Sequence, residues 1–341
     1  MSGTRLHSTR RTFLRHGTSA MALGALAATR LGRARAQDFP ARNIVITIPT
    51  AEGGGADRDV RNFTAVWQNH IDTNFEYEFY PGAAGQVGYE VYVGKKEPDA
   101  YNLLFANTGP EVIMQVLQKP PVQLGKDFVY FIKTSSEPMS LWVGKNSPFE
   151  TVEQLVDEGK KRVVTVSVSR LPHPASIGVL ALGEATGAQF QLVPFGGGNP
   201  SAMAAITGEV DACALPLANP VKLADEARIL AVFTKRNPVA EEADNAPPVN
   251  EVFGTDIPEL SSSRAFGIHV AAIEQYPERF EILKTTMAEV FEDPAYAEQV
   301  RSSGIPTEFI DYGDQDAAMA EAEAVQELAM KYESLLTGED G

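Results

Sequence analysis

The sequence has 341 residues, of which 29 are basic and 45 acidic, giving a formal net charge of −16. So acidic a chain is a poor candidate for nucleic-acid binding and would be repelled by anionic membranes. Its length suits two domains, and its single cysteine, Cys213, excludes an internal disulfide.

The first 36 residues have the pattern of a secretory signal. Arg10 and Arg11 precede Phe-Leu, a small and apolar stretch covers residues 18–29, and the segment ends in Ala-Arg-Ala at Ala36. The apolar stretch is shorter than the roughly 20 residues of a membrane span, which favours a cleaved signal over an anchor. We therefore predict a twin-arginine-type signal peptide over residues 1–36, and a periplasmic mature protein with a net charge of about −23.

Hydrophobic periodicity divides the rest of the chain into alternating strands and helices. Apolar, β-branched runs predict strands at residues 43–48, 76–80, 101–106, 128–132, 140–143, 162–169, 190–195, 210–215, 228–234 and 264–271. Helical spacing predicts helices at residues 60–71, 86–94, 110–117, 151–159, 175–185, 200–207, 277–291 and 315–336. Residues 237–259 are expected to form a long surface connection. This alternation predicts largely parallel pairing of the strands.

Local sequence also predicts several helix ends and the state of the cysteine. Asp57 is expected to be the N-cap of the first helix, and Thr151 with Gln154 forms a capping-box pattern. Gly187 is expected to end the helix before it. Cys213 is interpreted as a small buried residue rather than a catalytic thiol. The histidines lack metal-ligand spacing, so we expect no metal and no cofactor.

Three glycine-rich segments, residues 48–57, 80–88 and 193–201, each follow a predicted strand and open a predicted helix. The start of a helix presents unpaired N–H groups and the positive end of its dipole, which suits an anion. Glycine also adopts positive φ at little cost, so the triple glycine Gly53–Gly55 taken alone is equally compatible with a simple tight turn.

Five motifs in chain order resemble those of one known family: IVITIPTAEGGGAD, PGAAGQVG, EPDAYNLLFANTG, VPFGGGNPSAMAAITGEVDACALPL and ILAVFTKRNP. They are similar to motifs of the tripartite tricarboxylate transporter substrate-binding proteins, the Bug family of periplasmic solute receptors. The resemblance implies an α/β, two-lobed periplasmic binding protein, type II-like, with mixed, mostly parallel sheets flanked by helices. It implies lobe 1 over residues 37–138 and 257–341, completed by the C-terminal helices, and lobe 2 over residues 139–256.

The resemblance also implies a function. Such a protein captures a small carboxylate, a di- or tricarboxylate or an aromatic acid, by closing its cleft, and delivers it as a monomer to membrane permease subunits. A sensor that presents its closed form to a membrane receptor stays open as an alternative. A secreted hydrolase is a weaker alternative, because Ser167, Ser169 and Ser176 lack a GxSxG setting and no GxxxxGK[ST] or HExxH occurs.

The expected ligand contacts lie in the glycine loops and the segments that would face them. They are Thr50, Ala51, Glu52, Gly53, Gly54, Gly55, Ala83, Ala84, Gly85, Gln86, Asn107, Thr108, Ser167, Ser169, Arg170, Gly196, Gly197 and Arg264. Glu52, Arg170 and Arg264 depart from the family pattern, which suggests a different or larger acid. An arginine grips a carboxylate bidentately, so we expect at least one of the two to pair with the ligand, the alternative being a surface or hinge position.

Overall fold

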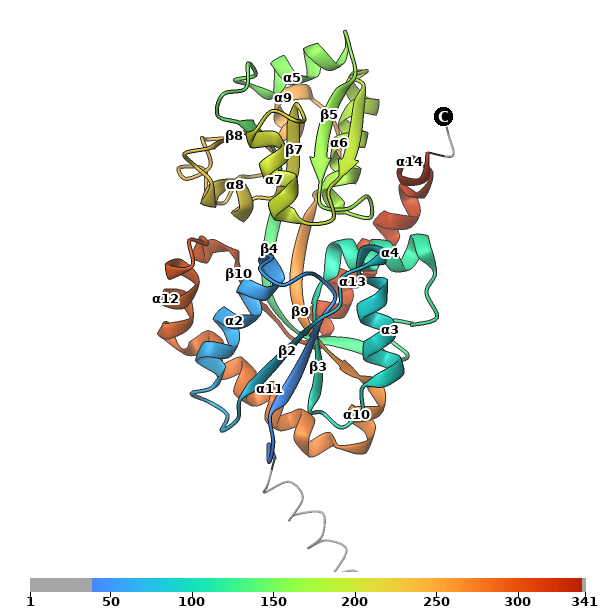
Figure 1. The fold of residues 1–341 in the computed structure, drawn as a ribbon, viewed down its shortest axis with the longest axis vertical. Coiled ribbons are helices and arrows are strands. Elements are labelled where there is room, and N and C mark those ends of the chain that lie inside the picture. Colours follow the sequence, from blue (N-terminus) through green and yellow to red (C-terminus); the bar gives the residue numbers. More distant parts are fainter. Residues whose placement is uncertain (1–38, 339–341) are drawn as a thin grey trace, which may run out of the picture. The chain divides into compact units, whose positions relative to one another are not determined.

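The computed structural model describes residues 39–338, and the chain separates into two compact units, Met1–Arg42 and Asn43–Gly341. Only residues 39–42 of the first unit are described, and they contain no helix or strand. The predicted signal peptide lies outside the described residues. All helices and strands below belong to the second unit (Figure 1). None of the described helices combines the length and apolar character that crossing a membrane requires.

The second unit alternates strands and helices for most of its length. Its strands are β1 (Ile44–Ile48), β2 (Phe75–Phe79), β3 (Asn102–Asn107), β4 (Phe128–Gly144), β5 (Val164–Val168), β6 (Phe190–Pro194), β7 (Ala212–Pro216), β8 (Ala227–Val232), β9 (Ser261–His269) and β10 (Ile310–Gly313). Its helices are α2 (Gly55–Trp67), α3 (Gln86–Lys95), α4 (Thr108–Gln118), α5 (Val152–Gly159), α6 (Pro174–Thr186), α7 (Gly198–Ile206), α8 (Ala218–Lys222), α9 (Val249–Phe253), α10 (Val270–Gln275), α11 (Pro277–Glu292), α12 (Pro294–Ser302), α13 (Gln315–Lys331) and α14 (Glu333–Thr337), with 3-10 turns η1 (Ala83–Gly85) and η2 (Thr307–Phe309).

The strands form a mixed sheet in the order β2-β1-β3-β9-β4-β7-β5-β6, and β8 and β10 also pair with β4. Strand β1 is parallel to β2 and β3 at one end, and β5 is parallel to β6 and β7 at the other. The pairs that involve β4 or β9 are antiparallel. The predicted parallel pairing therefore holds at the two ends of the sheet and not in its middle. Helices flank both ends, which gives the two-lobed α/β architecture (Figure 1).

Strand β4 joins the two ends of the sheet. The sequence predicted two separate strands here, because the polar segment Thr134–Glu137 interrupts the apolar pattern. The structure has one strand of 17 residues instead. Its first part, through Pro138, pairs with β9, and the part from Met139 onward pairs with β7 and β8. Backbone partners on both sides keep the polar stretch extended, and this is information that the local sequence does not contain.

Helix α2 is anchored by aromatic packing on its inner face. Phe63 and Trp67 are fully buried, and the Phe63 ring lies 5.1 Å from that of Phe266 on β9. The helix begins at Gly55 with Gly54 as its N-cap, so the prediction that Asp57 is the N-cap is wrong. Asp57 lies in the first turn, where its carboxylate accepts a hydrogen bond from the backbone N–H of Gly53 at 2.8 Å. A carboxylate at this position stabilises the helix through its dipole.

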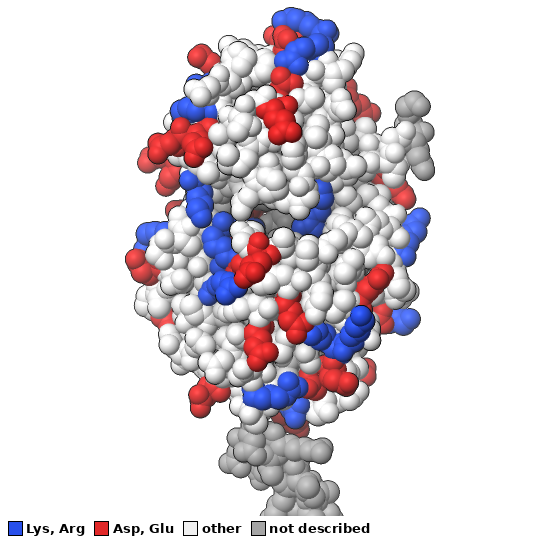
Figure 2. All heavy atoms as spheres, viewed as in Figure 1, with Lys and Arg blue, Asp and Glu red and all other residues white. Residues whose placement is uncertain are grey.

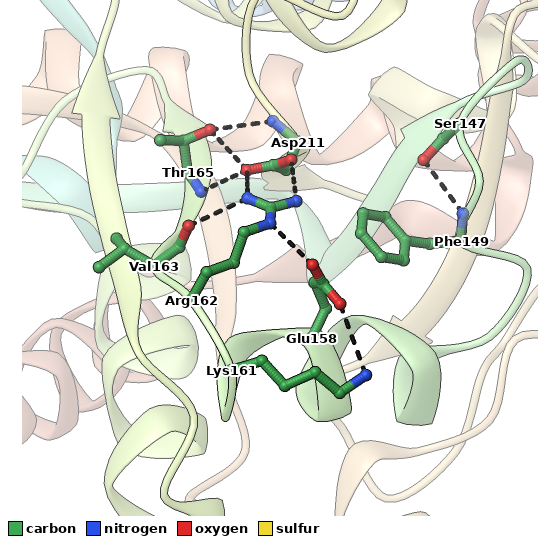
Figure 3. A network of polar contacts seen from close by, with 8 residues as sticks. All are labelled: Ser147, Phe149, Glu158, Lys161, Arg162, Val163, Thr165 and Asp211. Atoms are coloured by element: carbon green, nitrogen blue, oxygen red, sulfur yellow. Dashed lines mark hydrogen bonds and ion pairs between the residues drawn. The ribbon is translucent and has the colours of Figure 1, made fainter.

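Polar contacts tie α5, β5 and β7 together (Figure 3). Arg162 donates from both terminal nitrogens to the Asp211 carboxylate at 2.8 and 3.0 Å, and from Nε to Glu158 at 2.8 Å. Asp211 also accepts from the backbone N–H and hydroxyl of Thr165 at 2.8 and 2.9 Å. These hydrogen bonds, chiefly those from Arg162, lower the pKa of Asp211. The predicted cap of α5 is confirmed, since Thr151 accepts from the backbone of the third helical residue.

Candidate functional site

A cavity of about 410 Å³ lies where loops from both ends of the sheet meet. Its walls come from the segments that follow β1, β2, β3, β5, β6 and β7, together with residues of β4 and β9. Figure 2 shows the molecule hollowed near its middle, with basic side chains on either side of the opening. Small ligands of α/β proteins bind beside the carboxyl ends of parallel strands, which is where this cavity lies.

Most of the residues predicted from the sequence line this cavity. They are Thr50, Ala51, Glu52, Gly54, Gly55, Ala83, Ala84, Gly85, Asn107, Ser169, Arg170, Gly196, Gly197 and Arg264. The three glycine-rich segments, far apart in the sequence, therefore come together around one space.

Four predicted residues do not line the cavity. Ser167 is fully buried within the second end of the sheet, where its hydroxyl donates to the carbonyl of Ser201 at 2.8 Å. Thr108 is buried and donates to a β9 carbonyl, and the Gln86 side chain donates to a glutamate on its own helix at the surface. Gly53 has φ +78° and serves the turn. The two hydroxyls and the amide are therefore engaged in structural bonds, and ligand contact by Ser167, Thr108, Gln86 and Gly53 stays a prediction.

Two helices point uncapped N-termini at the cavity. Helix α2 has Gly54 as its N-cap and α7 has Gly197, and neither helix receives a side-chain cap hydrogen bond. Both caps line the cavity, one from each end of the sheet. The first turn of a helix has N–H groups without intrahelical partners, and its dipole adds positive potential. The two N-termini together provide donors suited to an anion.

The loop after β2 has strained backbone at the cavity wall. Ala83 and Ala84 have φ values of +44° and +57°, in the left-handed region that residues other than glycine rarely adopt. Such conformations cost about 1–3 kcal/mol each and concentrate at functional sites. Here they form the turn η1 that shapes the wall next to Gly85.

Arg170 links the two ends of the sheet across the cavity. It follows β5, and its Nη1 donates to the carbonyl of Ala84 at 2.7 Å and lies 3.6 Å from Oε1 of Glu111. Glu111 is fully buried in α4, where it accepts from the Tyr89 hydroxyl at 2.9 Å. Burial raises the pKa of Glu111, and the positive charge of Arg170 opposes that rise. Arg170 is therefore not a freely solvated surface residue, as one of the sequence-based alternatives had it.

Arg264 is buried in an ion-pair cluster at the wall of the cavity. Only 6% of the residue is exposed; its Nε lies 2.9 Å from Asp59, and its Nη1 pairs with Glu137. Burial opposes the charge of Arg264, but Asp59 and Glu137 outweigh it and raise its pKa. The guanidinium is thus permanently charged and held in one orientation.

His173 is the N-cap of α6 and not a free base. Its Nδ1 accepts from the backbone N–H of Ala175 at 3.1 Å, and the residue is 4% exposed. Burial, with the charges of Arg170 and Arg264, lowers the pKa of His173 to about 3. The ring is therefore neutral at physiological pH, and it lines the cavity as a structural cap.

The sequence reasoning missed several residues of the cavity. Arg58, Glu137 and Asn219 all line it, and the side-chain oxygen of Asn219 is buried without a hydrogen-bond partner among the described residues. Arg58 stands in the first turn of α2, three residues after Gly55, so helical spacing would have placed it beside the glycine loop. Glu137 and Asn219 lie in segments that reach the cavity only through the pairing of the strands, so the local sequence does not predict their place there.

The described residues show no arrangement suited to metal binding or thiol chemistry. Within residues 39–338, no group of three or more His, Cys, Asp or Glu side chains is placed to hold a metal ion. Cys213 is fully buried, as predicted, and burial raises the pKa of its thiol.

Comparison with protein families gives a match over residues 77–330 to the tripartite tricarboxylate transporter family receptor. The chain belongs to this family. Comparison with curated protein sequences gives no match.

Several solved structures have a similar fold. R. palustris Rpa4515 with adipate has a TM-score of 0.77 at 22% identity, over 88% of this chain and 99% of that one. MatC from Rhodopseudomonas palustris with bound malate has a TM-score of 0.71 at 20% identity, over 87% and 100%. The periplasmic binding protein BugD has a TM-score of 0.72 at 16% identity, over 87% and 98%. At these identities the likeness establishes the fold of the receptor and not its ligand.

Proposed function

We propose that this receptor captures a small dicarboxylate in the periplasm by closing its cavity around it, and delivers it to a tripartite tricarboxylate-type membrane transporter. The single observation that carries the proposal is the pair of uncapped helix N-termini, at Gly54 and Gly197, that meet at one cavity from the two ends of the sheet. A ligand held by both would favour the closed arrangement, since binding energy selects the state that makes both sets of contacts.

Hydrogen bonds between residues from the two ends of the sheet also support closure. Besides Arg170, the Asn199 side chain of α7 donates to the carbonyl of Gly53 at 3.3 Å, so both lobes already touch at the rim of the cavity. We infer from the strand pairing that the lobes are residues 37–138 with 257–341, and residues 139–256, with β4 as the strand that crosses between them and a second crossing just before β9. Hinge closure would then bend the chain at these two crossings.

The choice of a dicarboxylate rests on the cavity and on the relatives. The proteins solved with adipate and with malate are similar to this chain in fold. Cationic groups stand at two separate places in the wall, Arg264 near the loop after β1 and Arg170 near the loop after β2. This spacing suits a ligand with an acid at each end.

Calorimetry on the purified mature chain, treated with EDTA, tests the proposal. We expect adipate or malate to bind with a dissociation constant in the micromolar range or below. Hexane-1,6-diamine, which has the length of adipate but cationic ends, is the matched control and should not bind. Failure of adipate, malate, succinate and glutarate alike, or equal binding of the diamine, would overturn the proposed function. Release of a new product from a bound ester would indicate the hydrolase alternative instead.

Export and delivery are tested separately. We propose that residues 1–36 direct twin-arginine export, so changing both Arg10 and Arg11 to Lys should retain the protein in the cytoplasm. A pull-down of the ligand-loaded receptor from membranes distinguishes a permease partner from a sensor kinase or other receptor.

A further inference from the structure

Two arginines converge on the start of α2. Arg58 belongs to the first turn of that helix and Arg264 to β9, and both line the cavity. A Cβ built on Gly55 would lie 2.9 Å from Nη2 of Arg264 and 3.6 Å from Nη2 of Arg58. The terminal nitrogens of both side chains therefore lie over the backbone of one glycine, next to the uncapped amides of the helix.

One carboxylate orients both arginines. Oδ1 of Asp59 accepts from Nε of Arg58 at 3.1 Å, and its Oδ2 lies 2.9 Å from Nε of Arg264. Glu137 engages Nη1 of Arg264. Within residues 39–338, the hydrogen bonds of these two arginines come from Nε of Arg58 and Nη1 of Arg264, and none comes from Nη2. Asp59 thus holds Arg58 by a hydrogen bond and Arg264 by an ion pair without a hydrogen bond, and the Nη2 groups are left as donors at the cavity.

The charges of this cluster balance, so directional donors remain rather than excess charge. Arg58 and Arg264 are matched by Asp59 and Glu137. An anion that enters accepts hydrogen bonds from these donors and is favoured by the positive end of the helix dipole. A planar carboxylate fits the fork of a guanidinium better than a spherical ion does.

We propose that Arg58 and Arg264 bind one terminal carboxylate of the ligand directly, together with the N-terminal amides of α2, and that Asp59 is the positioning residue for both. This deepens the proposed function and rests on it. The loop glycines alone offer only backbone donors, whereas the two arginines make recognition of this end specific for an ionised carboxylate.

Three variants test the assignment by calorimetry with adipate and malate. Arg58→Gln should weaken binding of the dicarboxylate by about 30-fold or more, the usual consequence of removing one member of a desolvated charge pair. Arg58→Lys should recover only part of the loss, since it restores the charge without the fork. Arg61→Gln is the matched control, because Arg61 lies on the same helix, pairs with Asp57 and does not line the cavity; its affinity should stay within about twofold of the wild type.

Asp59→Asn separates positioning from simple attraction. Asp59 and the ligand are both negative, so removing the charge of Asp59 should strengthen binding if Coulomb forces alone decide the affinity. We expect weaker binding instead, because both guanidinium groups lose the carboxylate that orients them. Thermal unfolding checks that each variant is folded.

The possible outcomes separate the two proposals. If the wild type binds neither adipate, malate, succinate nor glutarate, the proposed function fails and this inference fails with it. If the wild type binds but Arg58→Gln binds as tightly as Arg61→Gln does, the function stands and the arginine subsite is refuted. If Asp59→Asn binds more tightly, the positioning role of Asp59 is refuted.

Discussion

The buried cap of α6 makes stability depend on pH in a way that one substitution should remove. His173 is held neutral by burial and by the charges of Arg170 and Arg264, which lower its pKa to about 3 from an ordinary value of 6.5. The unfolded chain binds a proton at this ring below pH 6.5, and the folded chain does not until near pH 3. Because the unfolded state then holds more protons, the free energy of unfolding falls as the pH falls through this window.

The magnitude follows from the two pKa values. Each pH unit between 6.5 and 3 costs about 1.4 kcal/mol, so His173 alone should remove about 2 kcal/mol between pH 7.5 and pH 5. Replacement by Asn keeps a side-chain oxygen to accept from the backbone N–H of Ala175 and removes the titration. The variant should be less stable at pH 7.5 because of lost packing, but that difference should shrink by about 2 kcal/mol at pH 5.

Chemical denaturation of both proteins at pH 7.5, 6 and 5, with the slope of each transition checked, measures this difference. The other titratable groups are common to both proteins, so subtracting one free-energy curve from the other isolates the contribution of the imidazole. A difference in the free energy of unfolding between wild type and His173→Asn that stays constant from pH 7.5 to pH 5 would refute the argument that the ring is held neutral.

Two further substitutions examine the link across the cavity and the start of α2. Arg170→Gln should lower the free energy of unfolding by about 1–3 kcal/mol, because it leaves the buried Glu111 carboxylate without its cation. Adding Glu111→Gln should restore most of that loss, as measured by denaturant unfolding in a double-mutant cycle, whereas additive losses would show that the two side chains are not coupled. Gly55→Ala should change thermal stability little, because the roughly 1 kcal/mol by which alanine favours a helix opposes the cost of shifting the buried guanidinium of Arg264. It should nevertheless weaken dicarboxylate binding about tenfold or more, since its methyl group displaces that guanidinium, whose Nη2 lies 2.9 Å away. Gly94→Ala on α3, with no atom within 4 Å of the added carbon, is the control; equal affinities for the two variants would contradict the crowding argument.

Local sequence determined the elements whose causes are local. Strand β1 is a β-branched run that forms because its residues pack on both faces of a sheet, and the cap at Thr151 needs only the amide three residues on. The αL glycine at Gly187 ends α6 for an equally local reason. The glycine-rich segments likewise predicted three of the loops that line the cavity, since a glycine-rich turn between a strand and a helix can be recognised in the sequence.

The bounds of elements that depend on contacts with other parts of the chain could not be predicted from the local sequence. Asp57 has a residue type suited to an N-cap, but the glycines before it allow α2 to start earlier, so the acid lies inside the first turn. Strand β4 continues through its polar stretch because β9 pairs with it on one side and β10 on the other.

Tertiary structure alone decided which side chains face the cavity. Ser167 lies on a predicted strand next to the site, yet the alternation of the strand turns its hydroxyl into the interior. Arg58 and Arg264 are far apart in the chain, and they meet only because β9 pairs with β3 beside the start of α2. The sequence predicted the loops because a loop depends on local chemistry. The pair of Arg58 and Arg264 is a long-range contact, which forms only through the packing of the sheet.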